Sequence, residues 1–462
     1  MRKFQLSFFA FLSCIFCFGQ SEDSLMIRHI ADEILLHSKA YDNLHDLTKN
    51  IGGRLTASPQ FYKAEQWGLK ILKQSGADKT WLQECLVPHW IRGGKDQADA
   101  RYNAVTGSRH IQGKKVLDVL ALGNSIGTGP KGITADVIEV KSFDDLETKK
   151  DDVKGKIVFY NYKFNPTFIS TFLAYGDAVR YRGSGPSEAA KHGALAVIVR
   201  SMSESADNNP HTGALRYDST LPKIPAVAVG LKDADWLSST LENKSVEVVL
   251  KTGGKFLPDT IGHNVIGELT GSDFPDQIIT IGGHLDSWDP AEGAHDDGAG
   301  VVHTIEILRA FKALGYKPRH TIRFVLFANE ENGLRGGTKY ADEAKAKNEK
   351  HVFALESDGG GFTPRAFSFG GTPEQLKKAQ SWVPLLHPYG VYEITGGGGG
   401  ADVNPLNTNL KTPVAELAPD SQRYFDIHHA RNDVFENVNK RELELGAVNM
   451  AALIYLVDKY GL

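Results

Sequence analysis

The sequence predicts an α/β protein: a three-layer sandwich with a mostly parallel central sheet, into which a separate β-rich module is inserted. After residue 255 the chain alternates between short strand-like runs and longer helical segments. Such alternation is typical of a parallel sheet covered by helices. Between residues 113 and 253 the sequence pattern is different: short β-rich runs follow one another, with Gly and Pro turns between them.

The segment before the inserted module combines helices with strands. Apolar residues at helical spacing predict a helix within residues 23–50. Ser58 precedes a second helical segment, which ends at Gly76. Residues 80–105 look like strands and loops.

The inserted module shows six β-rich runs and one helix that leads into a strand, and "KTGGK" at 251–255 is a plausible linker out of it. We therefore divide the chain into residues 1–19 as a signal peptide, 20–112 as the N-terminal part of the main domain, 113–253 as the insert and 254–462 as the remainder of the main domain.

Four short apolar runs in the last part of the chain read as parallel strands buried on both faces. They are Gln277–Gly283, Thr321–Ala328, Val352–Glu356 and Pro413–Leu417. Helices are expected between them, one starting near Ala299 and stopping at Gly315, one over Leu334 to Lys347, and a last one over Arg441 to Tyr460.

Composition excludes some classes of protein. The 462 residues are 41% hydrophobic, enough for a sizeable core, and carry a formal net charge of −4. A nucleic-acid-binding protein would usually show a basic face, so no nucleic-acid partner is expected. Beyond the N-terminus no stretch is long and apolar enough to span a membrane.

The N-terminus predicts export. Arg2 and Lys3 precede an apolar run over Leu6 to Phe18, and cleavage after Gly19 fits a secretory signal peptide. The protein is therefore expected to be secreted or periplasmic, with a lipid anchor on a signal-peptide cysteine as a minority alternative. Only Cys85 would stay in the mature chain, which predicts that it has no internal disulfide.

Metal-ligand residues follow three of the predicted strands. His284 follows the first, Glu330 and Glu331 come directly after the second, and Asp358 follows the third. In open α/β sheets, sites form beyond the carboxyl ends of the strands. One such residue is weak evidence, but three at successive strand ends predict a common site.

The residue types indicate the metal. His with Asp and Glu, and no Cys, suits zinc or a harder divalent cation. Several buried carboxylates are costly unless cations neutralise them, so a metal pair with a shared carboxylate is expected. Of Glu330 and Glu331, one would bind metal and the other would accept a proton from water.

These motifs resemble the co-catalytic zinc exopeptidases of metallopeptidase family twenty-eight. The family pattern is H-x-D, D-x-x-(S/A)-G, E-E, D, and a His followed four residues later by an acid. Here it reads "GGHLDSW", "HDDGAG", "FANEENGLRGG", "LESDGGG" and "HHARND", with every ligand position filled in order. The resemblance covers nearly the whole mature chain. It implies the zinc exopeptidase fold, with the insert similar to a protease-associated domain.

The resemblance implies a role for each residue. His284 and Asp358 would bind one zinc ion, Glu331 and His429 the other, and Asp296 would bridge the two. Glu330 would be the general base and acid, and Asp286 would hold the His284 imidazole from behind. In relatives the bridging Asp precedes a cis peptide, which would place one at Asp296–Asp297. His428 would face the substrate oxyanion, or it is merely an exposed neighbour of His429. The loop "TGGGGGADVNP" either borders the substrate site or is a plain surface loop.

The expected function is hydrolysis of terminal peptide bonds in dipeptides or short peptides, with two zinc ions per chain. An aminopeptidase specificity instead of a carboxypeptidase or dipeptidase specificity stays open, as does a homodimer. A one-metal glutaminyl-cyclase-like enzyme and a receptor-like binding protein on the same fold are weaker alternatives, because no ligand is lost here. A structural metal domain is disfavoured because such sites prefer Cys-rich ligand sets.

Overall fold

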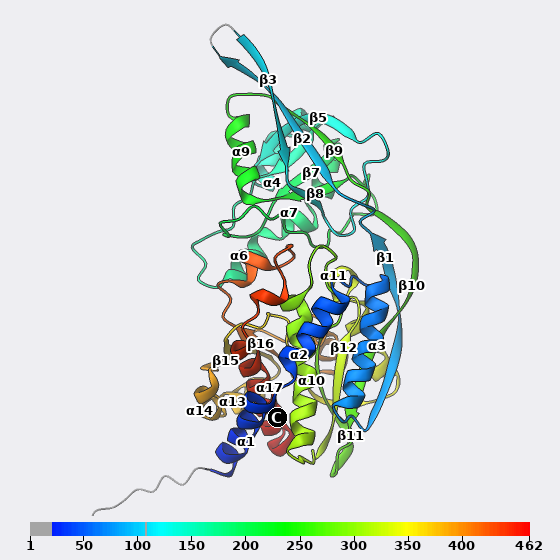
Figure 1. The fold of residues 1–462 in the computed structure, drawn as a ribbon, viewed down its shortest axis with the longest axis vertical. Helices are drawn as coiled ribbons and strands as arrows, with labels where there is room; N and C mark the ends of the chain where they lie inside the picture. The colour runs from blue at the N-terminus through cyan, green and yellow to red at the C-terminus, as the bar shows by residue number, and fades with distance from the viewer. Residues whose placement is uncertain (1–20, 107–108) are drawn as a thin grey trace, which may run out of the picture.

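The computed structural model describes residues 21–106 and 109–462, which fold around two eight-stranded sheets (Figure 1). The predicted signal peptide, residues 1–19, lies outside the described residues. Within those described ranges, no helix combines the length and the apolar character that crossing a membrane requires.

The main sheet is mixed. Its central strands run parallel, and antiparallel strands border them on both sides. The predicted parallel arrangement holds for the four central strands and again for the two strands at one edge, whereas the other pairings of the sheet are antiparallel. In spatial order the strands are β1 (Lys79–Ile91), β10 (Lys255–Leu269), β12 (His320–Phe327), β11 (Phe274–His284), β13 (Lys350–Glu356), β16 (Val414–Pro419), β14 (Pro364–Gly370) and β15 (Glu393–Gly396).

Helices cover both faces of this sheet. The larger layer packs its apolar side chains with strand residues such as Ile281 and Phe324, and the smaller layer packs against alternate residues such as Val325 and Phe327. This alternation follows from the two-residue period of a strand. The larger layer holds α1 (Glu22–His37), α3 (Pro59–Gln74), α10 (Ala299–Ala313) and α17 (Lys440–Tyr460), and the smaller holds α12 (Arg335–Ala346) and α15 (Asn404–Leu410).

Local signals fix the ends of these helices. Ser58 caps α3 by accepting a hydrogen bond from the Phe61 amide, and Pro59 occupies its first turn. Asn439 caps α17 in the same way. The remaining short helices are α2 (Ala40–His45), η1 (Asp46–Ile51), η2 (Ala294–Gly298), α11 (Glu330–Gly333), α13 (Pro373–Gln380), α14 (Val383–Leu386), η3 (His387–Tyr389), α16 (Tyr424–Ile427) and η4 (Phe435–Asn437).

The second sheet has its own core and begins earlier than the sequence suggests. It starts at Gln97, within the segment 20–112 that was assigned to the main domain, because β2 pairs with both β3 and β9. The strand order is β3 (Arg109–Leu117), β2 (Gln97–Thr106), β9 (Val246–Lys251), β5 (Ile133–Val140), β6 (Ile157–Tyr160), β7 (Ala196–Arg200), β8 (Ala226–Val229) and β4 (Val119–Ala121).

The helices in the same part of the chain are α4 (Phe143–Thr148), α5 (Lys150–Val153), α6 (Thr171–Ala178), α7 (Arg180–Gly183), α8 (Gly185–Lys191) and α9 (Leu231–Leu241). We call residues 97–251 the second-sheet module.

The long strands β1 and β10 carry the chain into and out of this module (Figure 1). The two connections touch at Gly93 and Gly253, where a Cβ on Gly93 would lie 2.2 Å from the Gly253 carbonyl oxygen. Gly93 also has a φ of 75°. Only glycine meets both demands without strain, so the crossing of the connections depends on it.

Candidate metal centre and active site

The first group of donors lies at the carboxyl ends of β11 and β13. Because these strands are parallel, His284 and Asp358 reach the same edge of the sheet. His284 Nε2 lies 3.1 Å from Asp358 Oδ1 and 3.2 Å from Asp296 Oδ1. These three side chains can hold one cation between them.

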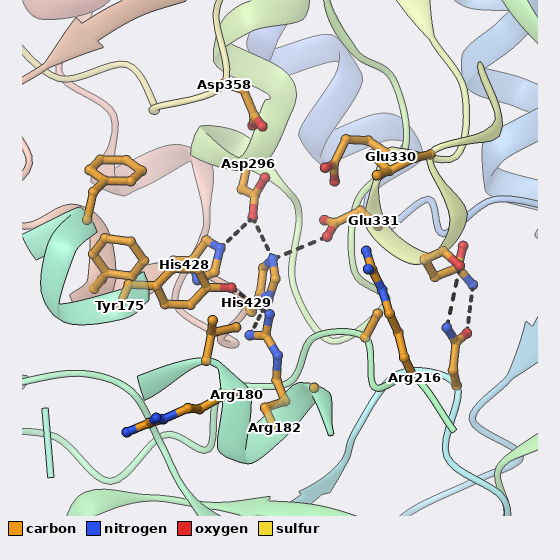
Figure 2. Close-up of a pocket in the computed structure, with 18 of the residues that line it drawn as sticks. Tyr175, Arg180, Arg182, Arg216, Asp296, Glu330, Glu331, Asp358, His428 and His429 are labelled. Carbon is orange, nitrogen blue, oxygen red and sulfur yellow. Dashed lines mark hydrogen bonds and ion pairs between the residues drawn. The ribbon is translucent and has the colours of Figure 1, made fainter. Parts of the chain in front are cut away.

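The second group faces the other oxygen of Asp296. His429 Nε2 lies 3.2 Å from Asp296 Oδ2 and 3.2 Å from Glu331 Oε2 (Figure 2). Asp296 therefore turns one carboxylate oxygen to each group, which is the geometry that a bridging ligand needs.

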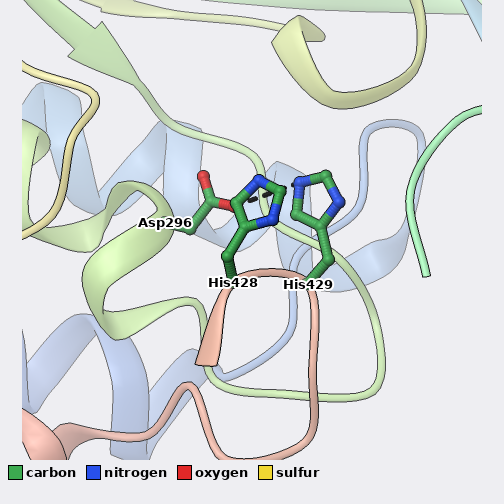
Figure 3. Close-up of side chains that lie close together, drawn as sticks. All are labelled: Asp296, His428 and His429. Atoms are coloured by element: carbon green, nitrogen blue, oxygen red, sulfur yellow. Dashed lines mark ion pairs between the residues drawn. The ribbon is translucent and has the colours of Figure 1, made fainter. Parts of the chain in front are cut away.

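His428 is a second imidazole beside the same oxygen. Its Nε2 lies 3.7 Å from Asp296 Oδ2, and its ring stacks on that of His429 with 3.5 Å between centroids (Figure 3). By proximity, Asp296, His428 and His429 also form a candidate cation group. We favour Glu331 over His428 as the ligand, because Glu331 Oε2 lies 3.2 Å from His429 Nε2 and Glu331 Oε1 is buried with no hydrogen-bond partner among the described residues.

The donor set fits cations. Asp296 Oδ2 and Glu331 Oε1 are buried and find no hydrogen-bond partner among the described residues. Burial raises the pKa of both Glu331 and Asp358, and neighbouring carboxylates add to the effect. Such a cluster is stable as anions only when positive charge lies among them. Two divalent cations at these groups would supply it.

The Asp296 loop is fixed by acids that stay outside the donor groups. Asp433 accepts hydrogen bonds from the amides of His295 (2.7 Å) and Asp296 (3.1 Å). Asp297 accepts from the amides of His284 (3.0 Å) and Gly300 (2.8 Å). The Asp296–Asp297 peptide is cis, as the resemblance implied.

Asp286 acts differently from the prediction. His284 Nδ1 lies 3.0 Å from the main-chain oxygen of Asp286 and 3.8 Å from its carboxylate. The carboxylate instead accepts hydrogen bonds from the Glu330 amide (3.1 Å) and the Thr56 hydroxyl (2.8 Å). The main chain of Asp286 thus orients the imidazole, while its side chain positions Glu330.

Glu330 lines the cavity beside both groups of donors (Figure 2). It follows Asn329, whose φ of 62° turns the chain sharply at the end of β12. Burial raises the pKa of Glu330 well above its ordinary value; His284 opposes the shift, and Asp358 and Asp402 reinforce it. A raised pKa makes a carboxylate a stronger base, as a group that accepts and returns a proton requires.

The second-sheet module closes the site from the other side. The Thr212 amide donates a hydrogen bond to the His429 main-chain oxygen (2.9 Å), and the Thr212 oxygen lies 3.3 Å from His429 Nδ1. With Nδ1–H donating to that oxygen, Nε2 is left free to bind a cation. No local sequence pattern predicts this contact, which joins residues far apart in the chain.

Module residues also line the cavity, which has a volume of about 690 Å³. The Arg182 guanidinium donates to the Thr212 oxygen (3.2 Å) and to the Tyr175 hydroxyl (2.5 Å). The Tyr175 ring meets the His428 ring edge-on. Phe172, Tyr424 and Phe425 add apolar surface to the wall.

Gly213 gives a direct test of the Thr212–His429 contact. Its φ is 121°, and a Cβ there would lie 2.4 Å from Arg182 Cζ and 2.6 Å from His429 Nδ1. We expect Gly213→Ala to displace His429 and to weaken zinc binding by about 10- to 100-fold, as loss of a partner behind a metal ligand does. Competition with a zinc chelator measures the change.

Gly176→Ala is the matched control, because a Cβ on Gly176 meets nothing within 4 Å. Unaltered zinc retention in Gly213→Ala would show that the contact does not orient His429.

The fold and the site together define a metallopeptidase. Paired imidazole and carboxylate donors meet at the carboxyl edge of an α/β sheet, in a cavity that also holds a carboxylate suited to proton transfer. The model of "Peptidase family M28" matches residues 264–454. Curated relatives extend the match over most of the chain, and the chain belongs to this family as a metallo-exopeptidase.

Human carboxypeptidase Q is 35% identical over 422 residues, which is 91% of this chain and 85% of the relative. The bovine protein of the same name is 34% identical over 91% of this chain and 85% of its own length. Both agree with the carboxypeptidase Q branch that "HLDSWD", "ESDGG" and "FDIHHARND" indicate.

Solved structures agree on the fold. A peptidase M28 precursor from Shewanella amazonensis superposes with a TM-score of 0.88 at 32% identity, covering 95% of this chain and 97% of the other. A zinc aminopeptidase from Bacillus subtilis gives a TM-score of 0.64 at 21% identity, with 90% and 94% covered.

Proposed function

We propose that this chain is an exported dinuclear zinc exopeptidase that acts as a carboxypeptidase or dipeptidase on short peptides. The observation that carries the proposal is the placement of Asp296, whose two oxygens each face a separate ligand pair. His284 and Asp358 would hold one zinc ion, Glu331 and His429 the other, and Asp296 would bridge them. The zinc-dependent relative from Bacillus subtilis supports the choice of metal.

When bound, the zinc pair supplies the Lewis acidity that activates water and polarises a carbonyl. Glu330 takes a proton from the attacking water and returns it to the leaving amine. Its main-chain amide is tied to the Asp286 carboxylate, which fixes the base relative to His284.

His428 is assigned to the developing oxyanion. Burial lowers the pKa of His428 well below its ordinary value, and the neighbouring His429 adds to this. A neutral imidazole at the cavity wall can donate one hydrogen bond without bringing a charge.

Two further assignments accompany this proposal. The N-terminal signal peptide would direct the protein to the periplasm or the exterior, and the second-sheet module corresponds to a protease-associated domain. The relatives named carboxypeptidase Q support the choice of a carboxypeptidase.

A panel of dipeptides with free or blocked termini, incubated with zinc-loaded protein, tests the function. We expect cleavage to survive an acetylated amine and to fall when the carboxylate is amidated. Loss of cleavage on blocking the amine alone would assign an aminopeptidase. No cleavage of any peptide by protein that holds two zinc ions would overturn the proposal.

A further inference from the structure

The start of α6 and the residues just before it carry an apolar surface that faces solvent. Within residues 168–173, Ile169 is 85% exposed and Leu173 is 60% exposed, while Phe168 and Phe172 are 37% and 38% exposed. We call these four residues the α6 patch. Large apolar side chains that stand singly on a surface need no explanation, whereas a contiguous group of them typically marks a place where another molecule binds.

Hydrogen bonds fix the backbone of the α6 patch against the main domain. The Thr171 hydroxyl donates to the Ser421 main-chain oxygen (2.6 Å), and Gln422 Nε2 donates to the Ile169 main-chain oxygen (2.8 Å). Both bonds join the second-sheet module to the loop that precedes α16. A surface whose backbone is already fixed loses less freedom when a ligand binds, so this position is suited to recognition.

The α6 patch is continuous with the wall of the active-site cavity. Phe172, Tyr175 and Val179 all line the cavity, and their spacing of three and four residues places them on one side of α6. The Phe172 ring stacks on the Tyr424 ring of the main domain, with 5.3 Å between the centroids. Phe172 therefore belongs both to the cavity wall and to the patch, and apolar surface runs from the cavity to the outside of α6.

The roles assigned to Glu330 and His428 set the direction of the peptide. Glu330 returns a proton to the leaving amine, so the released C-terminal residue lies on its side of the cavity. His428, which is assigned to the oxyanion, lies toward α6, with 5.0 Å between the centroids of its ring and the Tyr175 ring. Tyr175 and Glu330 lie on opposite sides of His429 (Figure 2). The residues that precede the cleaved bond therefore leave the cavity past α6.

We propose that the α6 patch binds apolar side chains of the peptide substrate that lie two or more residues before the cleaved bond. The cavity of about 690 Å³ has room for the residues beside that bond, and the rest of a longer peptide meets the patch at the cavity mouth. Apolar burial is not directional, so the patch selects apolar character and not one particular side chain. The inference rests on the proposed function and deepens it, because it names a substrate class: short peptides with an apolar N-terminal part.

The test uses N-acetylated peptides and the zinc-loaded full chain. A dipeptide is compared with two tetrapeptides that end in the same dipeptide and begin with Leu-Leu or with Ser-Ser, and the release of the C-terminal residue is measured. In the wild type we expect kcat/KM for the Leu-Leu peptide to exceed that for the Ser-Ser peptide by about 10-fold, mainly through KM, as burial of about one leucine side chain predicts. Ile169→Ser combined with Leu173→Ser should remove this preference and leave cleavage of the dipeptide unchanged.

Leu25→Ser combined with Leu36→Ser is the matched control. Both leucines are exposed side chains of α1, at 43% and 72%. This helix lies at the end of the main domain that is farthest from the second-sheet module (Figure 1). The control variant loses the same kind of surface elsewhere, so it should keep the wild-type preference for the Leu-Leu peptide.

An unchanged preference for the Leu-Leu peptide in the patch variant would overturn the inference while leaving the peptidase function intact, and so would a wild type that cleaves both tetrapeptides equally. Sedimentation velocity tests a second copy of the chain as the occupant. A wild-type dimer that the patch variant dissociates would assign the α6 patch to a subunit interface and overturn the inference as well. Absence of all cleavage in the wild type, of the dipeptide included, would instead overturn the proposed function.

Discussion

Replacing Glu330 by Gln should abolish turnover while the protein keeps its zinc. The amide cannot accept a proton from water, and it contributes no proton to the leaving amine. General acid–base catalysis is worth about 10²- to 10⁴-fold, so we expect kcat to fall by that amount. Steady-state kinetics on an N-acetylated dipeptide, with elemental analysis of the same sample, measures both quantities.

The neighbouring Glu331→Gln provides the contrast. Glu331 lies 3.2 Å from His429 Nε2 and is assigned as a ligand, so its loss should remove one zinc ion as well as activity. Wild-type-like activity in Glu330→Gln, or equal zinc loss in the two variants, would refute the division of labour between the adjacent glutamates.

Replacing Asp296 by Ala should cost both zinc ions. Its two oxygens face His284 on one side and His429 on the other, each at 3.2 Å. Among the residues that the structure describes, Asp296 is the side chain shared by both candidate cation groups. We expect zinc affinity at each position to fall by more than about 100-fold, the upper range for loss of a mere outer partner. Elemental analysis after dialysis against a weak chelator gives the zinc content per chain.

Asp289→Asn is the control from the same loop, because Asp289 pairs with Arg92 at 2.6 Å and takes no part in the donor groups. Retention of one zinc ion per chain in Asp296→Ala would mean that the aspartate belongs to one position only. Retention of both would remove it from the ligand set.

The strand-end residues of the site were predictable because one local rule places them. His284 and Asp358 follow short apolar runs, and parallel strands bring their carboxyl ends to the same edge. His429 follows no such run; only the acid four residues later distinguished it from His428. The structure places it against Glu331.

Other parts of the fold and of the site are not predicted, or not fully, by any local sequence pattern. Strands are expected within residues 80–105, where β1 lies, but the long antiparallel β1–β10 ribbon is not, because its residues lack the continuous apolar character of a buried strand. β2 was counted with the main domain because its pairing with β9 spans more than a hundred residues of sequence. Arg182 lines the cavity because the second-sheet module packs against the main domain, which no local pattern predicts.

For Asp286, the sequence motif predicts the residue but not which of its atoms contacts His284. The H-x-D spacing identifies the residue, but the choice between its carboxylate and its main-chain oxygen is made by rotamer and by competing donors. Here the Thr56 hydroxyl and the Glu330 amide donate hydrogen bonds to the carboxylate, and His284 is bonded to the main-chain oxygen instead.

The reciprocal Thr212–His429 hydrogen bonds have a thermodynamic consequence. A ligand that favours one conformation stabilises every contact which that conformation requires. Zinc held by His429 must therefore slow hydrogen–deuterium exchange at the Thr212 amide, which is bonded to the His429 oxygen. Chelation should speed this exchange, so an amide in the second-sheet module would report the occupancy of a metal position in the main domain.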